Sequence, residues 1–195
     1  MQFLKVTYHI DRNLAMPSNY PDLSTISLGL LIARLVIGPL MAAHGAQKLF
    51  GWFGGYGLNA TGEFMTSLGF SPGRRFAAAA SITEVAAGLL ITFGFLGPIG
   101  PALMLSVMIV AAVTVHLKNG VFAQANGIEL PLLYAAAAIG FGLTGFGQYS
   151  IDSFVGIAER LPAGWLVLAA GAIGGIANLA LRRQHATEPN HATAH

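Results

Sequence analysis

Long apolar runs separated by short polar segments fill most of the chain. Each run is close to the roughly 20 residues that an α-helix needs to cross the hydrocarbon core of a membrane. The runs cover approximately residues 26–43, 76–96, 99–117, 129–147 and 163–181. Because lipid offers no hydrogen-bond partners, each span has to pair its own backbone polar groups, which a helix does locally. The pattern therefore predicts an all-α membrane protein built from these membrane-spanning helices.

The polar segments between and around the runs define the expected organisation. The first four runs lie close together and are expected to form one four-helix transmembrane bundle, to which the last run adds a fifth, C-terminal transmembrane helix. The predicted units are an N-terminal arm over 1–25, a four-helix membrane domain over 26–152, the fifth transmembrane helix over 153–183 and a disordered tail over 184–195. Ser24 or Ser27 is expected to cap the first helix.

The longest predicted loop, residues 47–73, is rich in aromatic and glycine residues. It includes Trp52, Phe53 and Tyr56, and aromatic rings with a polar edge favour the membrane–water interface. Residues 61–68 are expected to form a short helix lying on that interface, with its apolar side chains turned inward.

Composition narrows the class of protein. The chain is 54% hydrophobic and only 9% charged, whereas a soluble domain averages about 25% charged residues. The net charge of +2 is too small to indicate a nucleic acid partner. The chain has no cysteine, which excludes thiol–disulfide chemistry and cysteine-ligated clusters or zinc.

Lysine and arginine are distributed unequally over the two predicted sides of the membrane. One side carries Lys5, Arg12 and Arg160, and the other carries Lys48, Arg74, Arg75, Lys118, Arg182 and Arg183. The positive-inside rule places the second side in the cytoplasm. The expected multi-pass topology therefore has the N-terminus outside and the C-terminus in the cytoplasm.

Polar side chains from the first four predicted helices and their adjoining loops reach the same half of the membrane. They are Arg34, His44, Gln47, Lys48, Glu84, His116, Asn126, Glu129 and Tyr134. The spans alternate in direction, so depths compare at about 1.5 Å per residue, and this comparison places Arg34 deepest. We predict that these residues form a ligand-binding pocket open to the cytoplasm, whereas the opposite half carries almost no polar groups.

An intramembrane charge costs about 2.5–3.5 kcal/mol, so such groups normally find partners inside the bundle. Arg34 and Glu84 are the expected pair, and that pair has the alternative role of a structural ion pair fixing helix register. Three other groups also have structural alternatives. His116 is a possible C-terminal cap, Lys48 a possible interfacial anchor, and Glu129 a possible partner of a helix dipole.

No catalytic residue and no metal site is assigned. The side chains of His44, His116, Glu84 and Glu129 are of the right types for a metal site, but their spacing does not define its geometry. In the fifth run, Gly171 and Gly175 have the spacing of a helix-association motif, which makes homo-oligomerisation a possibility.

The residues around the polar groups resemble the DoxX family of small bacterial membrane proteins. The matching pieces are Ala33-Arg34-Leu35, His44-Gly45-Ala46-Gln47-Lys48-Leu49-Phe50-Gly51, Glu84 with Gly88, His116 with Asn119-Gly120, and Asn126 to Pro131 with Tyr134. The resemblance covers about residues 28–152. It implies a four-helix core in the bacterial inner (plasma) membrane.

The resemblance also implies a link to quinone-dependent redox systems. Some relatives are described as small subunits of a thiosulfate:quinone oxidoreductase or a terminal quinol oxidase, and others belong to complexes that handle thiol and oxidative stress. The first hypothesis is therefore a quinone-binding or quinone-docking subunit of a redox complex, in contact with lipid and a redox-enzyme partner. Its expected cofactor is a quinone, and no covalently bound cofactor is expected. The alternatives are a small-solute or ion-coupled carrier and a membrane scaffold for a soluble redox enzyme.

Overall fold

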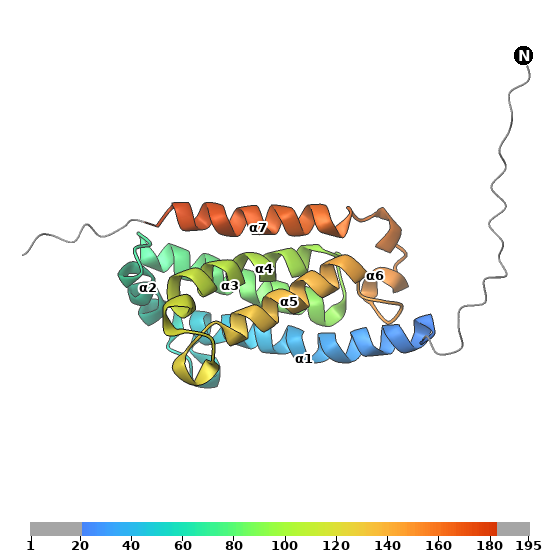
Figure 1. Cartoon of the computed structure of the whole chain (residues 1–195), viewed down its shortest axis with the longest axis horizontal. Helices are drawn as coiled ribbons and strands as arrows, with labels where there is room; N and C mark the ends of the chain where they lie inside the picture. Colours follow the sequence, from blue (N-terminus) through green and yellow to red (C-terminus); the bar gives the residue numbers. More distant parts are fainter. Residues whose placement is uncertain (1–20, 183–195) are drawn as a thin grey trace, which may run out of the picture.

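The computed structural model describes residues 21–182, and over that range the chain is a bundle of helices without a strand. The helices α1 (Leu23–Phe50), α3 (Gly73–Phe93), α4 (Ile99–Ala111), α5 (Glu129–Thr144) and α7 (Gly164–Ala180) run along one axis (Figure 1). The shorter α2 (Gly57–Ser67) and α6 (Ile151–Phe154) lie at opposite ends of the bundle (Figure 1). The predicted tail and most of the predicted N-terminal arm lie outside the described residues.

The class of fold predicted from the apolar runs is confirmed. Three helices are long and apolar enough to cross a membrane: α1, α3 and the continuous helical segment Ile99–Asn119, which starts with α4. Helices α5 and α7 are apolar but shorter, at 16 and 17 residues. The outer face of α1 exposes Ile32, Leu35 and Val36, as expected for a helix that faces lipid rather than water.

Helix α1 is longer than expected at both ends. Asp22, rather than Ser24 or Ser27, caps its start, because the Asp22 Oδ1 accepts the Thr25 N–H at 2.7 Å. The helix continues to Phe50 and ends at Gly51, whose φ of 76° is the left-handed conformation that glycine adopts readily. The loop expected from residue 47 therefore begins four residues later.

The far end of the third predicted span is not a regular α-helix. After Ala111 the chain forms a π-helix over Ala112–His116 and then a 3₁₀ turn over Leu117–Asn119. Such π segments widen a helix locally and recur at functional sites. This one carries His116, which lines the same cavity as residues of α2.

Glycines bring α1 and α3 close together. A Cβ added at Gly88 of α3 would lie 2.5 Å from the carbonyl oxygen of Gly38 and 2.8 Å from the Ala42 Cβ. On the other side of the contact, a Cβ at Gly45 would lie 2.6 Å from the Ser81 carbonyl oxygen. Because these neighbours are mostly backbone atoms, a side chain at these positions would force the two helices apart.

Gly88→Ala is therefore expected to lower the free energy of unfolding by about 2 kcal/mol, within the usual range for overpacking. Gly140→Ala on α5 is the matched control, because a Cβ there meets nothing within 4 Å. Alanine at position 140 is expected to be neutral or slightly stabilising. Unfolding of the two variants in detergent micelles measures the difference, and equal stabilities would contradict the close contact of α1 and α3.

Helix α7 packs on α4 through the two glycines of the predicted association motif. A Cβ at Gly171 would lie 2.5 Å from the Ala102 carbonyl oxygen, and one at Gly175 would lie 2.8 Å from the Ser106 carbonyl oxygen. The prediction that Gly171 and Gly175 join two copies of the chain is therefore wrong. The small residues do permit a close helix contact, but the partner helix belongs to the same chain.

Candidate functional site

Arg34 does not lie with the other predicted pocket residues. Its guanidinium is fully buried, with Nη2 donating to the Tyr149 carbonyl at 2.7 Å and Nη1 to the Thr92 carbonyl at 3.4 Å. Thr92 is about 12 Å along α3 from Glu84. The predicted Arg34–Glu84 ion pair is therefore wrong.

A second charged residue, Asp152, is joined to the surroundings of Arg34, because its backbone N–H donates at 3.0 Å to the carbonyl of Gly94, which lies against the Arg34 guanidinium. Asp152 is 3% exposed, and its two oxygens accept the backbone N–H groups of Leu96 and Gly97 at 2.9 and 2.6 Å. These contacts join the turn between α3 and α4 to α6. The expectation that this half of the bundle carries almost no polar groups is also wrong, because Arg34 and Asp152 form a structural polar cluster there.

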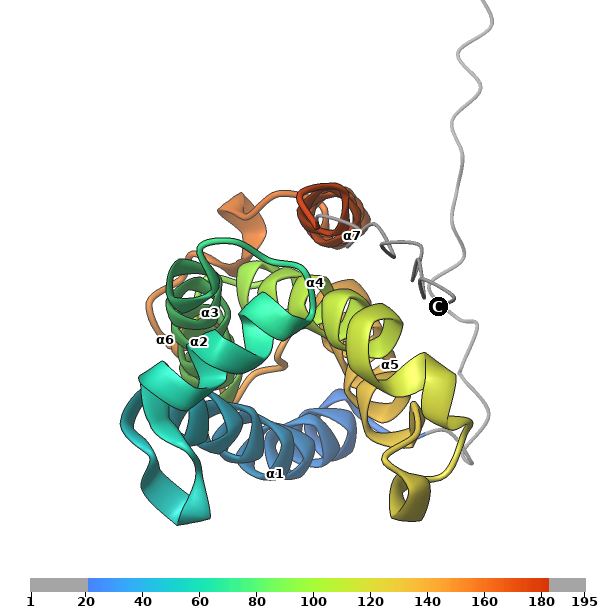
Figure 2. The same cartoon turned by 90° about the vertical axis from the view of Figure 1, so that its left-hand side faces the viewer.

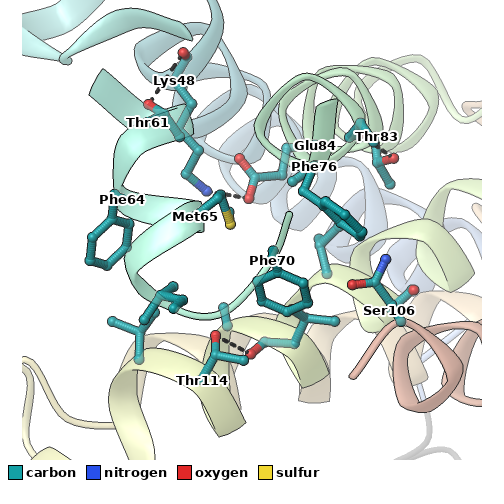
Figure 3. A pocket seen from close by; sticks show the side chains of 18 of the residues that line it. Lys48, Thr61, Phe64, Met65, Phe70, Phe76, Thr83, Glu84, Ser106 and Thr114 are labelled. Atoms are coloured by element: carbon teal, nitrogen blue, oxygen red, sulfur yellow. Dashed lines mark hydrogen bonds and ion pairs between the residues drawn. The ribbon is translucent and has the colours of Figure 1, made fainter. Parts of the chain in front are cut away.

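The opposite end of the bundle contains a cavity of about 310 Å³ between α2, α3 and α4, which reaches α7 at Asn178. Figure 2 shows α2 lying across this end of the bundle. Three of the predicted pocket residues, Lys48, Glu84 and His116, line the cavity. Most of the remaining wall is apolar and includes Phe64, Met65, Leu68, Phe70, Phe76, Leu103, Val107 and Val110 (Figure 3).

An ion pair between Lys48 and Glu84 forms the polar wall of this cavity (Figure 3). Lys48 comes from the last turn of α1 and its side chain is 34% exposed, whereas that of Glu84, in the middle of α3, is 3% exposed. Glu84 Oε1 accepts from the Lys48 ammonium, whereas Oε2 is buried without a hydrogen-bond partner. Lys48 is thus turned inward and is not the interfacial anchor of the alternative interpretation. A buried oxygen without a donor calls for an explanation, and a bound ligand is one.

His44 of α1 and Tyr134 of α5 contact each other. Their rings meet edge to face, with centroids 5.9 Å apart and an interplanar angle of 84°. His44 lies one helical turn before Lys48 on α1, but neither His44 nor Tyr134 lines the cavity. The structure therefore does not bring these two predicted pocket residues to its wall.

Gln47 holds the aromatic loop in place. Its Nε2 donates to the Phe53 carbonyl at 3.1 Å. Behind this loop lies a second cavity of about 520 Å³, which shares Lys48, Thr61 and Phe64 with the first. The two cavities are therefore neighbours across these three side chains.

His116, Asn126 and Glu129 organise the loop between α4 and α5. The His116 Nδ1 lies 2.9 Å from the Asn126 carbonyl oxygen, so its ring joins the π-helix to this loop. Glu129 Oε2 accepts the Ala123 N–H at 2.8 Å. Of the three, only His116 lines the cavity. The structure therefore does not bring the Asn126 and Glu129 side chains to its wall.

Several residues that line the cavity are not predicted from the sequence. Thr61 of α2, Ser106 of α4 and Asn178 of α7 line the cavity together with Phe70 and Phe76, whose rings are 5.1 Å apart. Asn178 carried a usable signal, since a lone amide inside an apolar run needs a polar neighbour or a cavity. The inward side chains expected of the surface helix, Phe64, Met65 and Leu68, do line the cavity.

Within residues 21–182, no group of three or more histidine, aspartate or glutamate side chains is placed to hold a metal ion. His44, His116, Glu84 and Glu129 are thus not gathered into such a group. The polar wall of the cavity is suited instead to an organic ligand that offers hydrogen-bond donors and acceptors.

The fold and this site define an all-α integral membrane protein with a buried ion pair at the wall of a largely apolar cavity. The model of the DoxX family matches residues 29–117, from the first turns of α1 to just beyond the π-helical end of α4. The matched residues include Lys48, Glu84 and His116, so the ion pair and the histidine lie in the part of the chain that is similar to the DoxX family. No curated protein and no solved structure matches the chain.

Proposed function

We propose that this protein binds the head group of a quinone in the cavity between α2, α3 and α4, as the membrane subunit of a quinone-linked redox complex. The observation that carries the proposal is the unpartnered, buried Oε2 of Glu84 at the cavity wall. A carboxylate oxygen in this position accepts a hydrogen bond from a hydroxyl group, which the reduced form of a quinone provides. The cavity volume of about 310 Å³ is at the lower end of the range for small-molecule sites.

The other polar groups at the wall complement the oxidised form. A quinone carbonyl accepts hydrogen bonds, and the Lys48 ammonium and the His116 ring supply donors at the cavity. The Phe70 and Phe76 rings provide flat apolar surface for the quinone ring (Figure 3). The Lys48–Glu84 pair thus gives one donor and one acceptor side by side, as a ligand that interconverts between carbonyl and hydroxyl forms requires.

The redox centre is assigned to a partner subunit. The sequence carries no haem, flavin or iron–sulfur motif. Conversion between a quinol and a quinone moves two electrons and two protons. We propose that the partner exchanges the electrons, while Glu84 and Lys48 hold the ligand and exchange protons with it.

The proposed partner docks from the cytoplasmic side of the bacterial inner membrane. Arg74, Arg75 and Lys118 are exposed at the cavity end of the bundle. The positive-inside rule assigns an end rich in lysine and arginine to the cytoplasm. Fusion of a cytoplasm-active reporter after Arg182 tests this orientation.

Binding of a short-chain quinone in its reduced form, the quinol, to the purified protein tests the proposal. Glu84→Gln keeps the size of the side chain but removes its charge, and it is expected to weaken quinol binding about 10- to 100-fold, the value of a hydrogen bond to a charged group. Glu63→Gln is the matched control, because Glu63 is an exposed carboxylate on α2 that does not line the cavity. Calorimetry in detergent gives the affinities, and size-exclusion chromatography confirms that the variants are folded.

Two results would reject the proposal. One is the absence of binding to the unaltered protein at ligand concentrations far above typical site affinities. The other is equal binding by the Glu84→Gln and Glu63→Gln variants, which would place the ligand elsewhere on the protein.

A further inference from the structure

The cavity that holds the Lys48–Glu84 pair continues sideways into a furrow over α4. The residues of this furrow come from three helices: Ala79 and Thr83 of α3, Ser106 and Val110 of α4, and Asn178 of α7. Helix α7 packs on α4 and α5, while α3 packs on the other flank of α4 (Figure 2). The furrow thus lies on the outer, lipid-facing side of the bundle and leads inward to the polar wall.

Apart from the Ser106 hydroxyl and the Asn178 amide, the side chains of the furrow are small and present little polarity to an occupant. Ala79 is exposed, and the Thr83 hydroxyl donates to the Ala79 carbonyl of its own helix at 2.8 Å. Further along the cavity, the Thr114 hydroxyl donates to the Val110 carbonyl, also at 2.8 Å. Because both hydroxyl hydrogens are used within their helices, methyl groups form much of the surface that remains.

The end of the furrow nearest the loops is closed. The Arg182 Nε, just after α7, donates to the Leu68 carbonyl at 2.6 Å, which ties α7 to the segment between α2 and α3. Between Leu103 and Ala111 the cavity wall extends about 12 Å along α4. With the end nearest the loops closed, the furrow between α3 and α7 opens sideways, toward the hydrocarbon of the bilayer.

We infer that the furrow between α3 and α7 is the exit for the isoprenoid tail of a membrane quinone whose head group lies at Lys48 and Glu84. This inference rests on the proposed function and specifies its ligand as a long-tailed lipid quinone that enters from the bilayer. A hydrocarbon tail matches the methyl-lined furrow, whereas a water-soluble ligand would have to cross lipid to use this opening. A tail in the furrow and a tail in lipid have similar apolar surroundings, so the furrow contributes access rather than much affinity.

A bulky side chain in the furrow distinguishes binding of the tail from binding of the head group. Ala79→Trp places a large side chain at the opening, and Ile82→Trp is the matched control on α3, since Ile82 is 56% exposed and does not line the cavity. The protein in lipid nanodiscs is titrated with two quinones that share one head group, the first with a methyl group and the second with a three-isoprene tail. Partition into the nanodisc is the same for all variants, so differences between variants report binding alone.

We expect Ala79→Trp to weaken binding of the tailed quinone at least tenfold and to leave binding of the tailless quinone unchanged. Ile82→Trp is expected to bind both as the unaltered protein does. If Ala79→Trp binds both quinones normally, or loses both equally, the tail does not leave through the furrow and the inference fails while the head-group site stands. If neither quinone binds to the unaltered protein, the proposed function itself fails.

A photoreactive group at the end of the tail gives an independent readout. Cross-links mapped by mass spectrometry are expected on α3 and α7 beside the furrow. Cross-links confined to α1 or α5 would overturn the inference, even if the head group binds as proposed.

Discussion

Replacement of Asp152 by alanine is expected to lower the free energy of unfolding by about 4 kcal/mol, because each of two hydrogen bonds to a charged group is worth about 1.5–3 kcal/mol. The buried Asp152 carboxylate accepts two backbone N–H groups, from Leu96 and Gly97. Alanine leaves these two donors without their acceptor and removes a negative charge from the part of the bundle that contains the fully buried Arg34. This is the largest single-residue effect that we expect in the chain.

One further variant separates the effect of the Asp152 charge from that of its hydrogen bonds, and a second serves as a control. Asp152→Asn keeps one oxygen for a backbone N–H but removes the charge, so its stability is expected to lie between those of Asp152→Ala and the unaltered protein. Glu159→Gln is the control, because Glu159 is an exposed carboxylate in the same connection. Thermal unfolding in detergent gives the order, and an Asp152→Ala variant as stable as Glu159→Gln would contradict the structural role of the cluster.

Replacement of Lys48 by methionine is expected to lower the free energy of unfolding by about 3 kcal/mol. This value is at the lower end of the range for removing one partner of a buried ion pair, because the lysine side chain is 34% exposed. The change leaves Glu84 buried without a counter-charge and without a partner for either oxygen. The carboxylate then either stays charged at a high cost or takes up a proton.

A double-mutant cycle isolates the interaction between the two side chains. Adding Glu84→Gln to Lys48→Met removes the uncompensated charge, so the double variant is expected to be more stable than Lys48→Met alone, with a coupling energy of about 1–3 kcal/mol. Lys118→Met, an exposed lysine at the same end of the bundle, is the control and is expected to be neutral. Strictly additive losses for Lys48→Met and Glu84→Gln would show that the pair does not interact in solution.

The apolar runs predicted the helices well because a membrane imposes a minimum length and local hydrogen bonding on every span. The ends of the helices are predicted less well, because polar residues such as Gln47 and Lys48 favour a loop when the sequence is considered alone. The structure keeps them in α1, where Lys48 reaches Glu84 and Gln47 holds the aromatic loop. A helix end depends on capping and tertiary contacts as much as on polarity.

The error at the end of α1 explains the wrong partner for Arg34. With the helix ending at Ala43, Arg34 is about 13 Å from that end, and Glu84 is about 12 Å from the expected start of its helix. With the true ends, Phe50 and Gly73, the corresponding depths are about 24 Å and about 16 Å. The two charges are thus at different levels. Lys48 reaches Glu84 because α1 and α3 pack with Gly45 against Ser81 and Val85.

The class of protein and the positions of its apolar helices follow from the sequence alone, because hydrophobic length and intramembrane charge are properties of a single segment. The sequence also places Lys48, Glu84 and His116 at one end of the bundle. The lengths of α5 and α7, the pairing of the charges, the role of Asn126 and Glu129 in a loop, and the contact of Gly171 and Gly175 with α4 follow only from the packed structure. Those outcomes depend on how far each helix extends and which face it turns to its neighbours, and these are set by packing between segments distant in the chain.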